Sequence, residues 1–359
     1  MKYNQIVSAI VIVNVTGILT GIAQLSSDHE PSLPIDQLQL MVIISPQYGN
    51  DKDILGAVQN YLFSVDDDLG WKGKIIALKA DENNYQKIDN IIELYYNIYK
   101  VKACILVGED IDTPLAGTYN DFVKPSTVPW STIGGFESYD LSYDMVVSRL
   151  YKINICISLV YPTFDTKFEE KKNQIISAFH KFTFNRNIKY DNKTLIFESS
   201  DINIKSKSTY QSLDYFTDLK YFENPVENLI KESYNQNYSM FAVHGHSSPA
   251  GTCINSINSY WFKPDYIKSI KSPIFAADGC YTNGWQINDN SNYKTQLFNS
   301  DNLQVMFLGL LTQNNDYFQT NFIENTMPEL FKGGTVAESM IGDFWLGDVV
   351  IYGDPTFHF

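Results

Sequence analysis

The sequence predicts an α/β fold with mostly parallel sheets. Short apolar runs without polar alternation recur along the chain, which is typical of strands buried on both faces of a parallel sheet. Segments with helical periodicity separate these runs, as the crossover connections of a parallel sheet require. With 359 residues, of which 44% are hydrophobic, the chain is long enough to bury a large core.

In the first half of the chain, apolar runs alternate with helical periods. We expect strands at residues 40–45, 74–78, 103–107 and 153–160, and helices at residues 51–64, 85–100 and 168–187. Residues 108–135 are rich in Pro, Gly, Thr and Asp and show no clear period, so we expect a long loop there. The polar connection at residues 189–193 is the best internal boundary.

The second half repeats the alternation without repeating the sequence. We expect strands at residues 194–197, 240–243, 274–277, 303–308 and 349–352, and helices near residues 225–234, 318–331 and 335–344. Since both halves share one α/β plan, we predict two side-by-side subdomains, an N-terminal one at residues 39–188 and a C-terminal one at residues 189–359.

The N-terminus has the pattern of a secretory signal. Residues 6–23 contain no charged residue, and Gly21 and Ala23 supply small side chains where a signal peptidase reads them. We therefore expect a signal peptide at residues 1–23 and a short tether at residues 24–38. The apolar run also approaches the length of a membrane span, so an uncleaved N-terminal membrane anchor is the alternative. Either segment places the body of the protein outside the cytosol.

Charge and cysteine usage restrict the partners and the redox chemistry. A formal net charge of -14 argues against binding nucleic acid or an anionic membrane surface, because both would repel it. Cys104 and Cys156 lie inside apolar runs, where cysteine usually acts as a small buried hydrophobe, so we expect no disulfide framework. Cys280 differs, because it follows Asp-Gly where an apolar run has ended and the chain turns.

Two apolar runs end in reactive side chains. Residues 240–243 lead into His244 and His246, and residues 274–277 lead into Cys280. Because the carboxyl ends of neighbouring parallel strands face one crevice, a His and a Cys on such strands can meet there. An imidazole stabilises a thiolate nucleophile, and backbone N–H groups in the turns can hold the negative oxygen that develops when the thiolate attacks a carbonyl. This chemistry needs neither a metal nor a cofactor.

At these residues the chain resembles the gingipain family of cysteine peptidases, in the group that includes caspases and legumains. Residues 238–249 resemble that family's strand and turn with the catalytic His, and residues 273–284 resemble its strand that ends in the catalytic Cys. Residues 99–110 and the closing Gly353-Asp354-Pro355 turn match as well, so the resemblance covers residues 36–359. It implies a caspase/gingipain-like α-β-α sandwich and a secreted cysteine endopeptidase (thiol protease) acting on protein or peptide substrates, with Cys280 as nucleophile.

The resemblance leaves the base and a third acid open. His246 lies at the family's usual distance from the strand but is followed by Ser247, whereas His244 keeps the Gly that follows the family's His; we favour His246. An acid that orients the His would follow the first strand of the second half. Asp201 fits that offset slightly better than Glu198, and a solvated loop acid is the plainer interpretation of either residue.

Two other functions are compatible with the same residues. The chain could be a catalytically inactive relative that serves as a binding module, for which the Ser after His246 is the suggestive feature. It could also be a metal-dependent hydrolase, because the spacing of His244 and His246 suits zinc. No third ligand stands at convincing spacing, so the peptidase is the favoured hypothesis.

Overall fold

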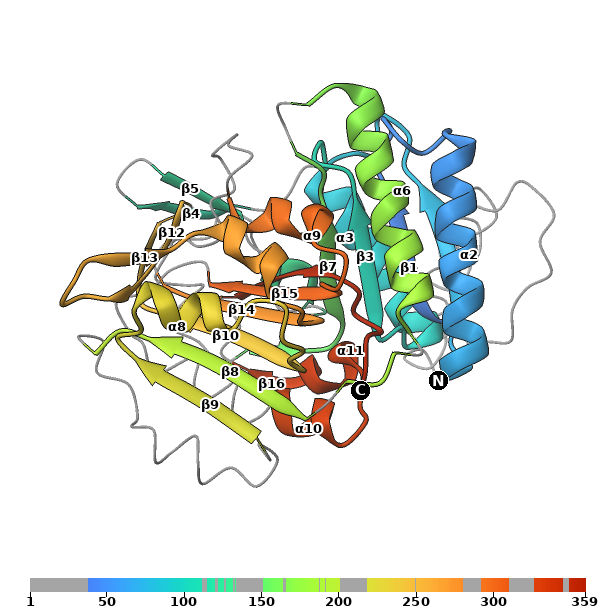
Figure 1. Ribbon diagram of the computed structural model, residues 1–359. Helices are drawn as coiled ribbons and strands as arrows, with labels where there is room; N and C mark the ends of the chain where they lie inside the picture. Colours follow the sequence, from blue (N-terminus) through green and yellow to red (C-terminus); the bar gives the residue numbers. More distant parts are fainter. Residues whose placement is uncertain are drawn as a thin grey trace, which may run out of the picture. The chain divides into compact units, whose positions relative to one another are not determined.

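The computed structural model describes most of the chain from Leu38 onward; the predicted signal peptide and the predicted tether up to residue 37 lie outside the described residues, and Leu38 belongs to the first strand. The described residues are 38–111, 115–119, 122–125, 127–131, 133, 151–163, 166–186, 188–190, 192–200, 218–248, 250–279, 292–309, 326–344 and 349–359. They belong to one compact unit, residues 36–359. A large, mostly parallel central sheet with helices packed against it runs through this unit, so the predicted α/β fold is confirmed (Figure 1).

The central sheet has the strand order β2-β1-β3-β7-β17-β15-β14-β10-β8-β9. Its strands are β1 (Leu38–Ile44), β2 (Lys72–Ala77), β3 (Ala103–Val107), β7 (Cys156–Val160), β8 (Lys193–Glu198), β9 (Asp218–Glu223), β10 (Met240–His244), β14 (Ile274–Asp278), β15 (Val305–Gly309) and β17 (Val349–Gly353). The strands β1, β2, β3, β8, β10, β14, β15 and β17 form where apolar runs predict them, with ends displaced by at most two residues. The edge strand β9 was not predicted, because its side chains are only partly buried and its sequence carries no apolar run.

The direction of the sheet reverses at one pair of described strands. β15 and β17 pair antiparallel, whereas the other neighbours in the sheet pair parallel. The set from β2 to β17 therefore runs one way and the set from β15 to β9 runs the other. As a result, the carboxyl ends of β1, β3 and β7 lie at the opposite edge of the sheet from those of β8, β10 and β14.

The helices of the first half form close to where periodicity predicts them. They are α2 (Lys52–Leu69), α3 (Tyr85–Tyr99) and α6 (Phe168–Phe184). The Asp51 carboxylate caps α2 by accepting hydrogen bonds from two backbone N–H groups, and Gly70 ends it with a left-handed φ of 68°. In Figure 1, α2 and α6 lie side by side against the sheet, where Tyr61 packs against the ring of Phe179 at 5.4 Å.

The helices of the second half are shorter. They are α8 (Glu227–Glu232), α9 (Gln296–Asn299), α10 (Met327–Phe331) and α11 (Val336–Met340), together with the 3-10 helices η1 (Pro264–Ser269) and η2 (Tyr293–Thr295). The predicted helix at residues 335–344 is wrong beyond Met340. Ile341 already has an extended backbone, with φ -83° and ψ 126°, so the helix ends before it, and residues Gly342–Phe344 form β16 instead. This strand pairs antiparallel with β6 (Tyr151–Ile153), so the predicted strand at residues 153–160 is divided between β6 and β7.

The expected long loop at residues 108–135 is also wrong in part. It contains an antiparallel hairpin, β4 (Leu115–Tyr119) with β5 (Phe122–Pro125), and the short helix α4 (Val128–Ser131). Tyr119, the last residue of β4, pairs with Phe122, the first residue of β5. The hairpin escaped prediction because its strands are short and carry Gly and Pro. Among the residues that the structure describes, no helix is both long and apolar enough to cross a membrane.

A buried ion cluster ties the C-terminus to α2 and α6. Arg186, just after α6, lies 3.2 Å from an Asp354 carboxylate oxygen, and Tyr61 of α2 donates a 2.5 Å hydrogen bond to the other oxygen of that carboxylate. Arg186 also donates to the Thr356 hydroxyl at 2.7 Å. The side chains of Arg186 and Asp354 are only 3% and 1% exposed, so each charge depends on its partners for compensation.

Asp354→Asn is expected to lower the free energy of unfolding by about 3–5 kcal/mol, because it leaves Arg186 buried without its main counter-charge. Urea denaturation followed by circular dichroism measures this loss. The control is Glu329→Gln, which removes an exposed ion pair with Lys332 and should cost less than about 1 kcal/mol. Equal losses in the two variants would show that the buried cluster contributes no more than a surface pair.

Candidate active site

The strands that carry the predicted His and Cys are neighbours in the central sheet. β10 pairs parallel with β14 on one side and with β8 on the other. In this register the last residue of β10, His244, is opposite Asp278 at the end of β14 and Glu198 at the end of β8. The carboxyl ends of the three strands therefore share one edge of the sheet, as the sequence predicts. Cys280 follows Asp278 by two positions and lies outside the described residues, as does Asp201.

His244 is buried and has a carboxylate for a neighbour. His244 is 2% exposed, and Glu198 is 3% exposed. Burial raises the pKa of the Glu198 carboxyl; the nearby charge of His244 and a hydrogen bond with Tyr221 of β9 act in the opposite direction and offset the rise in part. His244 is therefore buried at the carboxyl end of β10, next to Glu198, and is not accessible to solvent.

His246 lies in a different environment, because it is exposed. It begins β11 (His246–Ser248), which pairs antiparallel with β12 (Gly251–Asn255), and β12 pairs in turn with β13 (Tyr260–Phe262). Only Gly fits between the two histidines, since a Cβ on Gly245 would lie 2.0 Å from the Cys253 carbonyl oxygen. The chain therefore leaves β10 and enters β11 with one histidine buried and the next open to solvent.

The residue before Cys280 packs against the turn that carries His246. Gly279 has a φ of 155°, and a Cβ there would lie 2.0 Å from the Ser247 hydroxyl and 2.3 Å from the Gly245 carbonyl oxygen. Only glycine permits both this backbone conformation and this close approach. Gly279, the residue before Cys280, therefore contacts both chain neighbours of His246.

A chain of hydroxyl groups holds this turn in place. The Ser247 Oγ lies 2.9 Å from the Thr252 Oγ1, which lies 2.8 Å from the buried Tyr293 hydroxyl. The Tyr293 ring stacks on Phe275 of β14 at 5.3 Å. The His246 turn is therefore connected to the strand that leads to Cys280 by two routes, the Gly279 contact and the hydroxyl chain.

Sequence reasoning found the strand ends but ranked the acids differently from the structure. It placed Asp201 ahead of Glu198, whereas the register places Glu198 opposite His244. The available signal was that residues 194–197 and 240–243 are apolar runs of equal length, each followed directly by an ionisable residue. It missed Thr252 and Tyr293, because hydroxyl groups in unrelated segments give no pattern along the chain. Within the described residues, no group of three or more His, Cys, Asp or Glu side chains is arranged to hold a metal ion.

Comparisons with known proteins add no functional assignment. No family model matches the chain, and no curated protein matches it. A solved structure described as a XylFII-LytSN complex mutant aligns over 76% of this chain and 86% of that chain, at 9% identity and a TM-score of 0.17. A similarity this low carries no inference about fold or function.

Gly279→Ala is expected to destabilise the protein by more than about 2 kcal/mol, because the new methyl group would collide with the His246 turn. The control is Gly333→Ala: Gly333 also has a positive φ, 91°, but nothing lies within 4 Å of the added Cβ. It should therefore show only the backbone cost of about 1 kcal/mol. The free energies of unfolding of both variants test this; similar values would refute the close contact.

Glu198→Gln tests the buried acid through the pH dependence of stability. Because the pKa of Glu198 is raised in the folded protein, its stabilising contribution is present at low pH and is lost as the pH rises through the folded-state pKa. The variant should therefore become more stable relative to the parent protein as the pH is raised from acidic values to neutrality. Urea denaturation across this range measures the difference, with Asp218→Asn at an exposed position of β9 as the matched control.

Proposed function

We propose that the protein is a secreted cysteine endopeptidase of the gingipain type, with a caspase-like α-β-α sandwich built from two side-by-side subdomains. The observation that carries the proposal is the contact of Gly279 with Gly245 and Ser247, which connects the approach to Cys280 with the turn of His246. The two subdomains would share the central sheet, in which β17 of the C-terminal one pairs parallel with β7 of the N-terminal one.

In this proposal the Cys280 thiolate attacks the carbonyl carbon of the scissile peptide bond. The electron pair of the carbonyl moves onto oxygen, where the backbone N–H groups of Cys280 and Ser247 stabilise the negative charge. His246 holds the thiolate as an ion pair and then protonates the departing amine, which leaves a thioester on Cys280. A water molecule, deprotonated by His246, hydrolyses the thioester and restores the thiol.

We assign His246 rather than His244 as the base because of their surroundings. A base must reach both the thiol and the substrate, and His246 is exposed at the strand-end edge. His244 is buried beside Glu198, so we assign it a structural role at the end of β10. The difference in exposure also favours thiol chemistry over a metal site built from both histidines. Asp201 stays the candidate for an acid that orients His246.

The substrate would be a protein or peptide outside the cytosol, and no cofactor would take part. Delivery would use residues 1–23 as a cleaved signal peptide or as a retained membrane anchor. The high negative charge agrees with a partner that is neither nucleic acid nor an anionic membrane surface.

Labelling with iodoacetamide at neutral pH, read by intact mass, tests the nucleophile and its base. Cys104, Cys156 and Cys253 are buried, and burial raises the pKa of Cys156 to about 12, so these thiols should stay unreactive in the folded protein. We expect one fast site that disappears in Cys280→Ala and slows at least about tenfold in His246→Ala.

The controls are His244→Asn, which should slow labelling less than His246→Ala, and His180→Ala, an exposed histidine on α6 that should have no effect. Hydrolysis of denatured casein by the same variants should follow the labelling rates. Labelling no faster than a free thiol and indifferent to His246 would overturn the peptidase proposal and favour an inactive binding module.

A further inference from the structure

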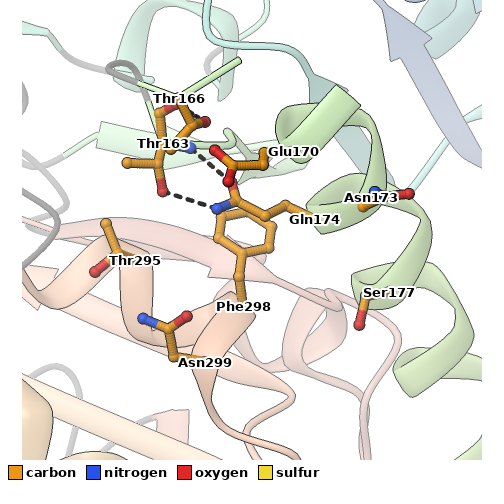
Figure 2. A pocket seen from close by; sticks show the side chains of 9 residues that line it. All are labelled: Thr163, Thr166, Glu170, Asn173, Gln174, Ser177, Thr295, Phe298 and Asn299. Carbon is orange, nitrogen blue, oxygen red and sulfur yellow. Dashed lines mark hydrogen bonds between the residues drawn. The ribbon is translucent and has the colours of Figure 1, made fainter. Parts of the chain in front are cut away.

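A polar pocket lies between α6 and α9. It has a volume of about 540 Å³, within the range of small-molecule sites. Figure 2 shows side chains of both helices and of the segment after β7 facing it. A pocket of this size accommodates one or two rings of a small polar ligand.

The pocket is separate from the candidate active site. Thr163 in its wall follows the carboxyl end of β7, and α9 in its other wall leads to the amino end of β15. Because β15 and β17 are antiparallel, these two strand ends share one edge of the sheet, opposite the edge where β10 and β14 end. A ligand here would not occupy the site proposed for peptide cleavage.

The lining indicates the chemical class of the ligand. It consists of four Ser and Thr hydroxyls, the amides of Asn173, Gln174 and Asn299, the carboxylate of Glu170, and one aromatic ring, Phe298. Among the described residues no lysine or arginine lines it, so a phosphate or a carboxylate ligand would lack a counter-charge. A lipid tail would lack an apolar wall. An uncharged molecule with many hydroxyl groups satisfies this lining.

Hydrogen bonds fix one of the amides before any ligand binds. The Gln174 carbonyl oxygen accepts a 2.8 Å hydrogen bond from the Thr163 backbone N–H, and its amide nitrogen donates to the Thr163 hydroxyl at 3.1 Å (Figure 2). An amide has two donor hydrogens and two acceptor lone pairs, so Gln174 keeps one of each for a ligand. The side chains of Asn173 and Asn299 make no hydrogen bond with any described residue, which leaves their groups for the same ligand.

Phe298 supplies the one apolar surface in the pocket. Its ring is half-buried and lies toward the middle of the polar side chains in Figure 2. A sugar ring in the pyranose form presents C–H groups on one face and hydroxyls around its edge. It could therefore pack that face on Phe298 while its hydroxyls meet the surrounding amides and the carboxylate.

The two walls are held together independently of a ligand. The Lys181 Nζ of α6 donates hydrogen bonds to the backbone carbonyls of Leu297 and Ser300, at 2.9 Å for the second, and so holds α9 against α6. A pocket that exists in the free protein binds a small ligand without the cost of ordering a loop.

We propose that this pocket binds an uncharged sugar residue of an oligosaccharide, with Phe298 under the ring and Asn173, Gln174 and Glu170 bonded to its hydroxyls. This binding is independent of the proposed peptidase activity and does not require Cys280. It would hold a glycan at the sheet edge opposite the catalytic edge.

Isothermal titration calorimetry of the folded Cys280→Ala protein with mannotriose, maltotriose and triacetylchitotriose tests the proposal. We expect at least one of these sugars to bind with a Kd of about 1 mM or lower, and Asn173→Ala and Phe298→Ala each to weaken binding at least about tenfold. Both residues are on the surface of the pocket, and circular dichroism verifies their folding. The matched control is Glu169→Ala, an exposed residue of α6 outside the pocket, which should bind like the parent.

Titration with a glycoprotein distinguishes attached glycans from free sugars, and titration with inorganic phosphate tests an alternative ligand. A glycoprotein carrying the bound sugar, tested against its deglycosylated form, shows whether the pocket takes attached glycans as well as free sugars; binding of either supports the proposal. Absence of binding by all three sugars, binding that is unchanged in both pocket variants, or preferential binding of inorganic phosphate would overturn it.

Discussion

The antiparallel pairing of β15 with β17 is the constraint on which the rest of the structure depends. Five residue pairs, from Val305 with Gly353 to Gly309 with Val349, reverse the direction of the central sheet. The reversal depends on a close approach at its end, since a Cβ on Gly353 would lie 2.1 Å from the Gln304 carbonyl oxygen. Asp354 next to it anchors the buried ion cluster with Arg186. The Gly-Asp-Pro turn at the end of the chain is thus explained by packing rather than by contact with a site.

Because of the reversal, the strands of the two sets end at opposite edges of the central sheet. At one edge β8, β10 and β14 end together, which places Glu198 beside His244 and the approach to Cys280 against the turn of His246. At the other edge, the end of β7 and the α9 crossover enclose the polar pocket. In a sheet with all strands parallel, the carboxyl end of β7 would lie at the edge where β8, β10 and β14 end, away from the amino end of β15. The reversed sheet instead places the proposed cysteine site and the proposed sugar pocket at opposite edges.

Local sequence accounts for much of the fold and for part of the candidate site. Strands such as β3 and β10 are buried along their whole length, so their apolar composition marks them without knowledge of their partners. The edge strand β9, the hairpin β4-β5 and strand β16 were missed, because each forms only through pairing with a specific neighbour. At the site, the sequence shows that His244 and His246 follow one strand. It does not show which of them is exposed.

The sequence by itself determined the α/β class, the buried strands and the residues that stand at their ends. These features follow from side-chain hydrophobicity and backbone preference, which act over a few neighbouring residues. Only the tertiary structure decided the strand order, the reversal at β17, the burial of His244 beside Glu198 and the contact between Gly279 and the His246 turn. Each of these joins segments far apart along the chain, and such contacts are selected by the packing of the whole core, which no local pattern specifies.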